Sequence, residues 1–517
     1  MAAIQGSLNR GTLSRDRLGV PSVVFFVMSA AAPLTVIAGV VTTAYAQIQV
    51  TGIPLGFITV AVILALFSVG YVAMSRHIAN AGAFYTYITH GLGRPLGVGG
   101  AWMALLAYNA LQMGLYGIIG AAMAPVLDKF FGVNPQWWVI ALATWAIVAI
   151  LGVLRVDVNG GVLAFLLCAE IAIVLVYDYA FLTKPADSAV TFDTLLPSNL
   201  FGTGFAAVGA VLVITFLGFV GFEASVVFSE ESKNPRRTVA LATYLALGII
   251  GGTYALSSWA MSVATGPANI IEVSTQNGPG TIFALAGERL PEVFVDIGLV
   301  LFATSVLAAA ISFHNTVARY TFALGRERVF PVLLSATARR SGAPFAGSLV
   351  QSVLGLVVII LYAAFNLDPV VQLFFWGGTG GGLGIMLLVT ITSLAVTMFF
   401  LRNPSGENVW RRLIAPVLSL LALGLVSYFT LKDFNALLGV APDDPLRWII
   451  PALYPAVGIL GVLWALILKG TKPDVYARIG LGANTGTGIS TQSRVVAGNQ
   501  YVAQHGPGAG AGRDIYQ

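Results

Sequence analysis

Long apolar runs, separated by short polar segments, dominate the amino-acid sequence. A helix needs about twenty apolar residues to cross the hydrocarbon core of a bilayer, and its backbone polar groups must be bonded internally there. Runs of that length start near Val20, Ile53, Leu96, Trp137, Gly160, Thr203, Val239, Phe294, Phe345, Val370, Leu413 and Ile449. The pattern predicts an all-α polytopic membrane protein with twelve transmembrane helices over residues 20–469.

Composition and charge distribution support this interpretation. The chain is 57% apolar and 9% charged, with a mean hydropathy of +0.85, and these values exclude a soluble domain of 517 residues. Most of its 27 Lys and Arg residues fall in segments that share one side with the two termini. The exceptions are Lys129, Lys184, Arg289, Lys432 and Arg447. Because cytoplasmic loops are enriched in Lys and Arg, we expect both termini in the cytoplasm and the chain in the cytoplasmic (inner) membrane.

The ends of the chain differ in composition from its apolar middle. Residues 1–19 are polar and basic, and residues 470–517 are rich in Gly, Ser, Thr and Gln. Segments of this kind bury too little apolar surface to offset the chain entropy lost on folding. We therefore expect a disordered cytoplasmic N-terminus and a disordered cytoplasmic tail on either side of the membrane domain.

The sequence offers little of what an enzyme, a pump or a nucleic-acid-binding protein needs. It has one cysteine, Cys168, and four scattered histidines, so we expect no metal site and no catalytic cluster. Nucleotide-binding motifs are missing, and the basic residues are spread over short loops, which argues against an ATP-driven pump and a nucleic-acid partner. We expect no enzymatic activity and no cofactor. The lipid bilayer and a small-molecule substrate are the expected partners.

The stretch from Thr215 to Arg237 has a composition that an uninterrupted membrane helix avoids. It carries Gly218 and Gly221 and places Glu223 among apolar residues. Glycine is unfavourable inside a helix, and a carboxylate inside a membrane usually marks a function. We interpret the stretch as a helix that opens in mid-membrane, where freed backbone groups can face a ligand. Close helix packing at the glycines, with Glu223 bonded to a neighbour, is the alternative.

Three motifs resemble one family of transporters. The Gly-Phe-Glu of residues 221–223, followed by the Glu-Glu-Ser-Lys-Asn-Pro-Arg-Arg of residues 230–237, resembles helix 6 of the amino acid/polyamine/organocation (APC) permeases. The Ala-Gly-Ala-Phe-Tyr-Thr-Tyr of residues 81–87 resembles the family's loop between helices 2 and 3. Residues 315–327, with the pattern Asn-x-x-x-Arg-Tyr-x-x-Ala-Leu-Gly-Arg-Glu, resemble the end of its helix 8. The resemblance indicates a bacterial amino acid permease of the APC superfamily.

The resemblance implies the leucine-transporter fold. In that fold two inverted repeats of five helices, here at about 20–182 and 203–401, pair a broken helix 1 with a broken helix 6 around a midplane site. Helices 11 and 12, at about 413–469, are expected at the periphery. In helix 1 the break is expected at Pro33, because proline removes a backbone donor and clashes with the preceding turn. A proline kink without ligand contact is the alternative.

The two breaks are the expected substrate site. Freed carbonyl groups can accept from an α-ammonium, and the N-terminal ends of half-helices attract a carboxylate. Asn109 and Gln112 share one face of helix 3, and the resemblance to arginine/agmatine antiporters places both amides toward the cavity, with helix–helix bonding as the alternative. The candidate substrate-binding residues are Ala30, Ala31, Ala32, Pro33, Leu34, Asn109, Gln112, Phe216, Leu217, Gly218, Phe219 and Gly221.

Glu170 and Glu223 fall well inside apolar runs and are the candidates for proton coupling. Relatives of the arginine/agmatine type carry a glutamate at the place of Glu223, whereas some relatives carry a lysine where this chain has Glu170. A purely structural role is the alternative for Glu170. Thr304 and Ser305 form a possible cation site, but hydroxyls that bond their own helix are commoner, so we favour protons over Na⁺.

Charged residues at the cytoplasmic ends of helices 6 and 8 are the candidates for an inner gate. Arg319 and Arg326 lie on one side of helix 8, where they can pair with Glu230 and Glu231. Exposed ion pairs are weak, and we expect these to break and re-form during transport.

A secondary active transporter accounts for paired breaks and isolated carboxylates better than other classes do. A membrane enzyme would need clustered catalytic side chains, and a channel gives no reason for two broken helices. We therefore expect an importer of an amino acid or related amine that works by alternating access with proton coupling. A polyamine or cationic-amine transporter and an amino acid exchanger are the alternatives. Both a monomer and a homodimer are compatible with the sequence.

Overall fold

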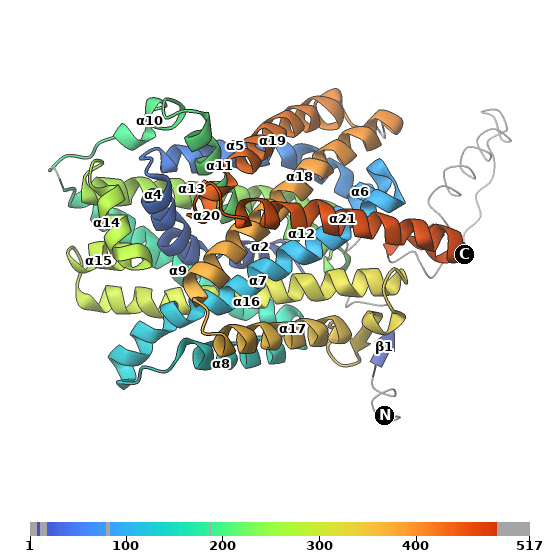
Figure 1. Cartoon of the computed structure of the whole chain (residues 1–517), viewed down its shortest axis with the longest axis horizontal. Helices are drawn as coiled ribbons and strands as arrows, with labels where there is room; N and C mark the ends of the chain where they lie inside the picture. Colours follow the sequence, from blue (N-terminus) through green and yellow to red (C-terminus); the bar gives the residue numbers. More distant parts are fainter. Residues whose placement is uncertain are drawn as a thin grey trace, which may run out of the picture.

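The protein is a bundle of long helices with one short pairing of strands near the end of the bundle (Figure 1). The computed structural model describes residues 8–10, 18–78, 83–154, 156–186, 188–404 and 406–482. The expectations for residues 1–7, 11–17 and 483–517, and for the start of the loop motif at 81–82, lie outside the described residues.

The helices follow the apolar runs. After β1 (Leu8–Arg10), the first half of the chain forms α2 (Val20–Ala31), α3 (Pro33–Thr35), the π-helical η1 (Val36–Val41), α4 (Thr42–Ile48), α5 (Ile53–Ser75), α6 (Ala83–Leu92), α7 (Arg94–Phe131), α8 (Trp137–Leu151), α9 (Val156–Thr183), η2 (Asp193–Leu195), α10 (Ser198–Phe201), α11 (Phe205–Phe219), α12 (Ala224–Val227) and η3 (Ser229–Glu231). The second half forms α13 (Pro235–Thr265), α14 (Ile270–Asn277), η4 (Gly278–Gly280), α15 (Thr281–Gly287), α16 (Glu292–Arg326), η5 (Val332–Ser335), β2 (Ala336–Ala338), α17 (Phe345–Ala364), η6 (Pro369–Phe375), α18 (Trp376–Arg402), η7 (Trp410–Ile414), α19 (Ala415–Lys432), α20 (Phe434–Leu438), α21 (Leu446–Thr471) and α22 (Pro473–Arg478).

Eleven helices of the described chain are long and apolar enough to cross a membrane. The sequence predicted twelve, and the difference lies in the run that starts near Trp137. This run gives α8, a helix of 15 residues, which is shorter than the about twenty residues that the hydrocarbon core requires. The structure therefore supports an all-α polytopic membrane protein with eleven helices of spanning length in its described part.

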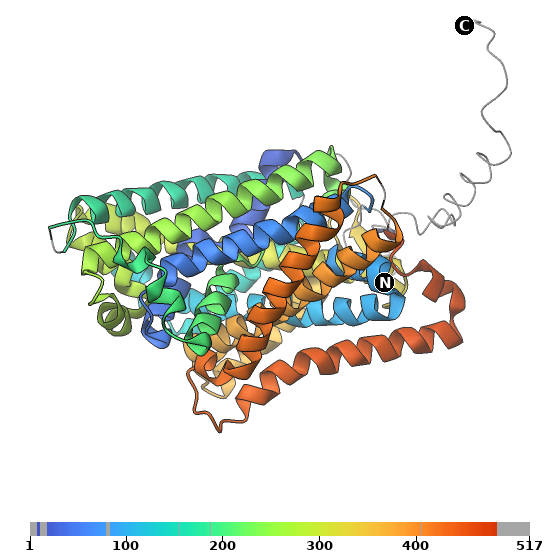
Figure 2. The same ribbon diagram turned by 90° about the horizontal axis from the view of Figure 1, so that it is seen from above.

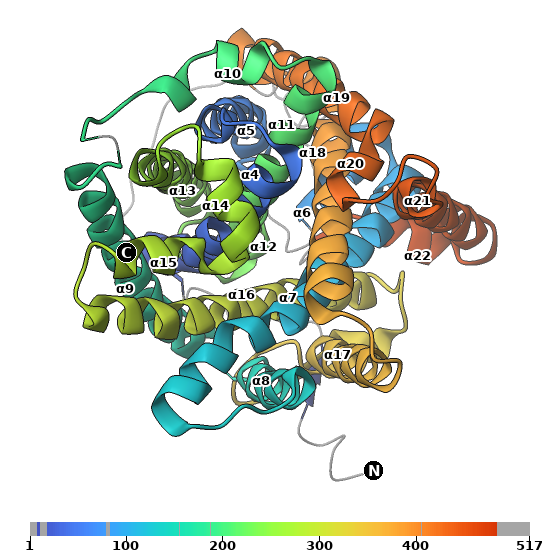
Figure 3. The same ribbon diagram turned by 60° about the vertical axis from the view of Figure 1, so that its left-hand side comes forward.

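Two helical segments lie at the centre of the bundle. In Val20–Ile48 and in Ala207–Val227, 94% of the most apolar window is buried, whereas the share is 28% in Leu446–Thr471. Figure 3 shows α4 and α12 inside a ring of α5, α13, α9, α16 and α18. α21, by contrast, runs along the outside of the bundle (Figure 2). Peripheral helices therefore keep apolar side chains exposed, as a lipid-facing surface requires.

Small residues allow the long helices to approach closely around α7, which packs against α16, α18 and α21. A Cβ atom added to Gly381 on α18 would lie 2.6 Å from Cγ of Leu111 on α7. On α21, a Cβ atom added to Gly461 would lie 2.8 Å from Cα of Gly99 on α7. The glycine run of α18 therefore serves close helix packing.

One end of the bundle carries β1 and α22, and we call it the terminal face (Figure 1). β1 pairs antiparallel with β2, with Leu8 opposite Ala338. Leu18 is fully buried, its N–H donates to the carbonyl of Glu231 at 3.0 Å, and the N–H of Lys233 donates to its carbonyl at 2.9 Å. Segments close to the N-terminus thus bond to the loops that follow α12 and α16.

The C-terminal segment is ordered further than its composition predicted. α21 continues to Thr471, α22 covers Pro473–Arg478, and Ile479 is only 2% exposed. The expectation of disorder from residue 470 is therefore wrong for residues 470–482, and β1 and Leu18 are ordered within the N-terminal segment as well. The reason is tertiary: these segments gain backbone hydrogen bonds and buried contacts that local composition does not reveal.

Candidate functional site

The helical course of the first central segment is interrupted after α2. α2 ends at Ala31, Ala32 adopts a left-handed conformation with φ 46° and ψ 72°, and α3 begins at Pro33. Pro33 has no N–H to continue the helical bonding pattern. The chain then passes through the π-helical η1, a local geometry that is frequent at functional sites.

The second central segment is interrupted between α11 and α12. α11 ends at Phe219, α12 begins at Ala224, and Gly221 between them has φ +113°. Only glycine adopts this φ without strain. A Cβ atom on Gly221 would lie 2.7 Å from Cβ of Ala30 and 3.2 Å from the backbone nitrogen of Ala31. The two interruptions are therefore in contact with each other.

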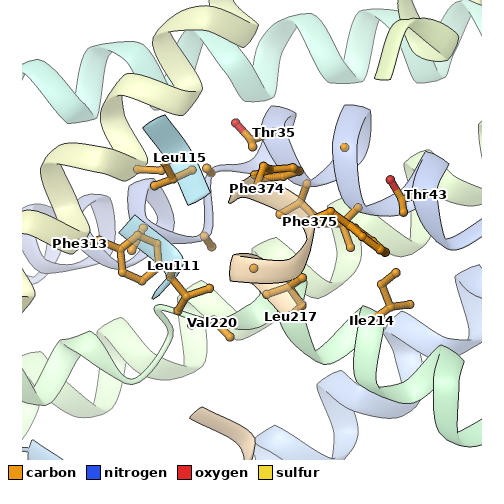
Figure 4. A pocket seen from close by; sticks show the side chains of 18 residues that line it. Thr35, Thr43, Leu111, Leu115, Ile214, Leu217, Val220, Phe313, Phe374 and Phe375 are labelled. Carbon is orange, nitrogen blue, oxygen red and sulfur yellow. The ribbon is translucent and has the colours of Figure 1, made fainter. Parts of the chain in front are cut away.

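A cavity of about 70 Å³ adjoins the two interruptions (Figure 4). The central segments supply one part of its wall, and α7, α16, η6 and α18 supply the rest. The lining residues are Ala30, Ala31, Ala32, Thr35, Val36, Gly39, Val40, Thr43, Leu111, Leu115, Ile214, Leu217, Val220, Ala309, Phe313, Phe374, Phe375 and Gly378. Apart from the hydroxyl groups of Thr35 and Thr43, these side chains are apolar.

The structure places the predicted substrate-binding residues at three kinds of position. Those that line the cavity are Ala30, Ala31, Ala32 and Leu217. Those at or beside the interruptions that are not among its lining residues are Pro33, Leu34, Phe216, Gly218, Phe219 and Gly221. Asn109 and Gln112 on α7 are not among the lining residues either.

Several residues that line the cavity were not predicted from the sequence. Leu111 and Leu115 are four residues apart on α7, a spacing that puts them on one helix face and could have suggested them. Phe374 and Phe375 come from η6, and Phe374 would lie 3.6 Å from a Cβ atom on Gly39. Nothing in the sequence connects η6 to the first central segment, so only the fold reveals this contact.

The amide nitrogens of Asn109 and Gln112 on α7 donate to protein groups, and neither residue is among those that line the cavity. Asn109 donates from Nδ2 to the carbonyl of Leu105 at 2.7 Å. Gln112 is fully buried and accepts at Oε1 from Nε2 of Gln351 on α17 at 2.7 Å. Its own Nε2 donates to the hydroxyl of Tyr116 at 3.2 Å. This geometry matches the helix–helix bonding that the sequence left as an alternative for Gln112.

Glu223 is fully buried at the second interruption. Its carboxylate accepts from the hydroxyl of Tyr108 at 2.6 Å and from the backbone N–H of Gly221 at 3.0 Å. Tyr71 donates to its backbone carbonyl at 3.1 Å. The side chain therefore caps the interrupted backbone of its own helix and is not among the residues that line the cavity.

Glu170 on α9 holds the equivalent place at the first interruption. It is 2% exposed, and its Oε2 accepts from the backbone N–H of Leu34 at 3.3 Å and from the hydroxyl of Ser305 at 2.9 Å. Thr35 donates from its hydroxyl to Oγ of Ser305 at 3.0 Å. The result is a polar network that joins α3, α9 and α16. Thr304 bonds its own helix through the carbonyl of Leu301 at 3.0 Å.

The sequence analysis did not single out a further buried carboxylate, Asp178 on α9. The structure leaves it 2% exposed, and its Oδ2 accepts from the hydroxyl of Ser257 on α13 at 2.7 Å. The backbone donors at the two interruptions, Leu34 and Gly221, bond Glu170 and Glu223 instead.

The candidate gate contains a buried ion pair near the terminal face. Arg319 donates from Nε to Oε1 of Glu231 at 2.6 Å and from its second terminal nitrogen to Oε2 at 3.2 Å, and both side chains are 2% exposed. The expectation that this pair is exposed and weak is therefore wrong. The guanidinium lies over the ring of Phe228, and the backbone of Glu231 is bonded to Leu18. Arg326 lies over the ring of Phe322 at 5.1 Å. The side chain of Glu230 lies outside the described part of the chain.

Comparison with known proteins identifies the family of this chain. The model of the family described as amino acid permease matches residues 22–472. The chain belongs to the amino acid permease family. Membership makes the protein a membrane transporter rather than an enzyme, with an amino acid or amine as its substrate class.

The permease is similar to several curated proteins. It is 23% identical over 406 residues to the low-affinity putrescine importer PlaP of Escherichia coli strain K12, covering 76% of this chain and 84% of the relative. It is 28% identical over 206 residues to human cationic amino acid transporter 4, covering 40% of this chain and 30% of the relative. It is 27% identical over 288 residues to the uncharacterized amino acid permease YecA of Bacillus subtilis, covering 53% of this chain and 62% of the relative.

Proposed function

We propose that this permease is a secondary active transporter that imports an amino acid or related amine across the cytoplasmic membrane, with proton coupling, by alternating access. In this proposal α8 is a twelfth span, the two five-helix repeats are inverted, α2–α3 and α11–α12 are the discontinuous helices 1 and 6, and the terminal face points to the cytoplasm. The observation that carries the proposal is the contact between the two interruptions beside the cavity. Backbone groups that leave a helix inside a membrane need other partners, and a substrate's ammonium and carboxylate groups supply them.

Two backbone donors at the interruptions support a route for proton coupling. The N–H of Leu34 donates to Glu170 and the N–H of Gly221 donates to Glu223. A substrate carboxylate has the same chemistry as these glutamate side chains and can compete for the same donors. Hydrogen bonds to an ionised acceptor are about twice as strong as bonds to a neutral one. Protonation of either glutamate therefore weakens the hydrogen bond that it accepts from the backbone N–H. The proton thereby releases the donor to the substrate, and proton and substrate bind together.

The buried pair of Arg319 and Glu231 supports alternating access. It fastens η3, which follows the second interruption, to the end of α16. Opening the terminal face separates these two elements and breaks the pair. The same movement alters the interruption next to it, because only Phe228 separates α12 from η3.

Uptake into liposomes tests the proposed coupling. Purified permease should accumulate amino acids when an inward proton gradient is applied, and the Glu223→Gln variant should lose this accumulation while it keeps exchange of substrate for substrate. Asp178→Asn is the matched control, because it neutralises a carboxylate that is also buried, at 2% exposed, but bonds Ser257. Proton coupling at this residue would be contradicted if accumulation by the unaltered protein did not depend on the proton gradient. It would also be contradicted if the Glu223→Gln variant still accumulated substrate.

A polyamine or cationic-amine transporter is the second candidate function. It is favoured by the similarity to a putrescine importer across 84% of that relative. In this case Glu170 and Glu223 would be counter-ions of the substrate, and Glu223→Gln would abolish substrate binding itself rather than coupling. An amino acid exchanger would show exchange but no gradient-driven accumulation in the unaltered protein.

A further inference from the structure

The wall of the cavity narrows the substrate class, an inference that rests on the proposed transport function. Aliphatic and phenylalanine side chains make up most of the wall, and Thr35 and Thr43 bring the only side-chain hydroxyl groups among the described lining residues (Figure 4). No ionisable side chain is among those lining residues. We infer that the substrate is a neutral amino acid with an apolar side chain.

The two carboxylates nearest to the interruptions are already bonded within the protein. Glu170 accepts from Leu34 and Ser305, and Glu223 accepts from Tyr108 and Gly221. Neither carboxylate is among the lining residues. A cationic side chain, or the second amine of a polyamine, would therefore lose its water in the cavity without gaining a counter-ion, and this loss is strongly unfavourable.

The phenylalanine rings do not remove this obstacle. Phe313, Phe374 and Phe375 face the cavity, and the face of an aromatic ring attracts a cation. That attraction is strongest for Trp and does not replace a full negative charge. The same three rings favour an apolar side chain directly, because burial of apolar surface on both partners removes it from water.

A binding panel tests the inferred class. Alanine and valine should raise the melting temperature of the purified permease, and lysine, arginine and putrescine should leave it unchanged at the same concentrations. Competition against labelled alanine should favour valine over lysine by at least about tenfold, which corresponds to about 1.4 kcal/mol. Preferential binding of lysine or putrescine would overturn the inferred class and leave the transport function standing. Failure of every amino acid and amine to bind or to be transported would instead overturn the proposed function.

A size variant gives an independent check. Leu111→Ala enlarges the cavity and should increase the uptake of leucine relative to alanine. Leu127→Ala is the matched control on the same helix, because Leu127 is not among the lining residues. Equal ratios of leucine to alanine uptake in the two variants would overturn the assignment of Leu111 to the side-chain pocket.

A different observation, at the terminal face, carries a second inference. Residues 479–482, which follow α22, lie against the end of α16 and against α6. Glu327 is fully buried, and its carboxylate accepts from the N–H groups of Gly480 and Gly482, both at 2.7 Å, and from the hydroxyl of Tyr85. Burial raises the pKa of Glu327, and the three hydrogen bonds oppose this rise because they favour the carboxylate. One buried carboxylate thus joins three elements that are distant in sequence.

The two glycines suit this contact for conformational reasons. Gly480 has φ +84° and Gly482 has φ +57°, a region in which other residues are strained. A Cβ atom on Gly480 would also lie 2.6 Å from Cγ2 of Thr89 on α6. Just before this segment, Arg94 at the start of α7 donates to the carbonyl of Ala477 at 3.2 Å. The segment is therefore attached through several specific contacts.

We propose that residues 479–482 are a latch that holds the terminal face closed. Glu327 directly follows α16, the helix that carries Arg319 of the buried ion pair. Alternating access requires the end of α16 to move relative to its neighbours at this face. The latch opposes that movement, because the end of α16 cannot leave α6 without breaking the bonds of Glu327.

Labelling of a single cysteine at the terminal face tests the latch in the full-length chain. Cys168→Ser removes the native thiol, and Ser229→Cys places a reporter at a position that is 2% exposed. In this background Gly480→Ala should increase the rate of maleimide labelling by about tenfold, the shift in population that about 1.4 kcal/mol produces. Gly470→Ala is the matched control, because a Cβ atom there meets nothing within 4 Å.

A second variant keeps the test independent of the folding of Gly480→Ala. Glu327→Gln keeps the shape of the side chain and removes its charge, so it should increase labelling in the same direction. Labelling rates equal to those of Gly470→Ala in both well-folded variants would overturn the latch.

Discussion

Removal of the negative charge of Glu231 should open the terminal face. In the Glu231→Gln variant the guanidinium of Arg319 stays buried and loses the negative charge and one acceptor oxygen of the carboxylate that bonds it at 2.6 and 3.2 Å. Loss of one member of a buried pair usually costs about 3–5 kcal/mol. The carbonyl and side chain of Asn315 and the ring of Phe228 remain in contact with the guanidinium. We therefore expect the lower end, about 3 kcal/mol or roughly a hundredfold in the ratio of closed to open protein.

The assay is the labelling rate of the Ser229→Cys reporter in the Cys168→Ser background. When the face opens and closes faster than the maleimide reacts, the rate follows the open fraction, so Glu231→Gln should label roughly a hundredfold faster at the expected cost. Glu288→Gln is the matched control, because Glu288 also pairs with an arginine, Arg289, but its side chain is 66% exposed. An exposed pair contributes at most about 1 kcal/mol, and this pair lies before α16 rather than at its end.

Equal labelling rates in Glu231→Gln and Glu288→Gln would refute the reasoning that burial makes the pair strong. The double variant Glu231→Gln with Arg319→Gln refines the test. It should label more slowly than Glu231→Gln alone, because no uncompensated charge then remains buried.

Three further outcomes follow from the geometry of the interruptions and from α9. Gly221→Ala should abolish uptake while the protein still folds. The φ of +113° at this position strains any residue with a Cβ atom by about 1–3 kcal/mol, and that atom would clash with Ala30. Gly424→Ala is the control and should transport normally, because a Cβ atom there meets nothing within 4 Å. Ser305→Ala should weaken the dependence of uptake on the proton gradient more than Thr304→Ala does, because only Ser305 bonds Glu170, and pH-dependent uptake measures the difference. Cys168 is exposed, so a lipid-soluble maleimide should modify it without loss of uptake.

The sequence predicted the parts of the structure that local physics controls. Apolar runs gave the long helices, because the length of a membrane helix follows from the thickness of the bilayer. α2 and α11 each end two residues before the residue that predicted the interruption, Pro33 and Gly221. Each of these two residues disfavours a continuous helix by its own covalent structure. The run at Trp137 shows the limit of this approach, since α8 is shorter than its apolar composition suggested.

The parts that the sequence did not predict depend on contacts between distant segments. Residues from η6 and α16 complete the cavity wall, and only the packing of the bundle brings Phe313 and Phe374 to Ala31. Arg319 and Glu231 come from distant segments, and the backbone of Glu231 also bonds Leu18, in the N-terminal segment that local composition predicted to be disordered. The order of Gly480 depends in the same way on Glu327, which lies more than 150 residues earlier in the chain.

Leu18 and the glycines at 480 and 482 lie outside the part of the chain that the family model matches. The match covers residues 22–472, whereas the residues that they bond, Glu231 and Glu327, lie inside it. In the proposed transport cycle, the resting conformation of the terminal face can therefore be changed by substitutions outside the matched transport core.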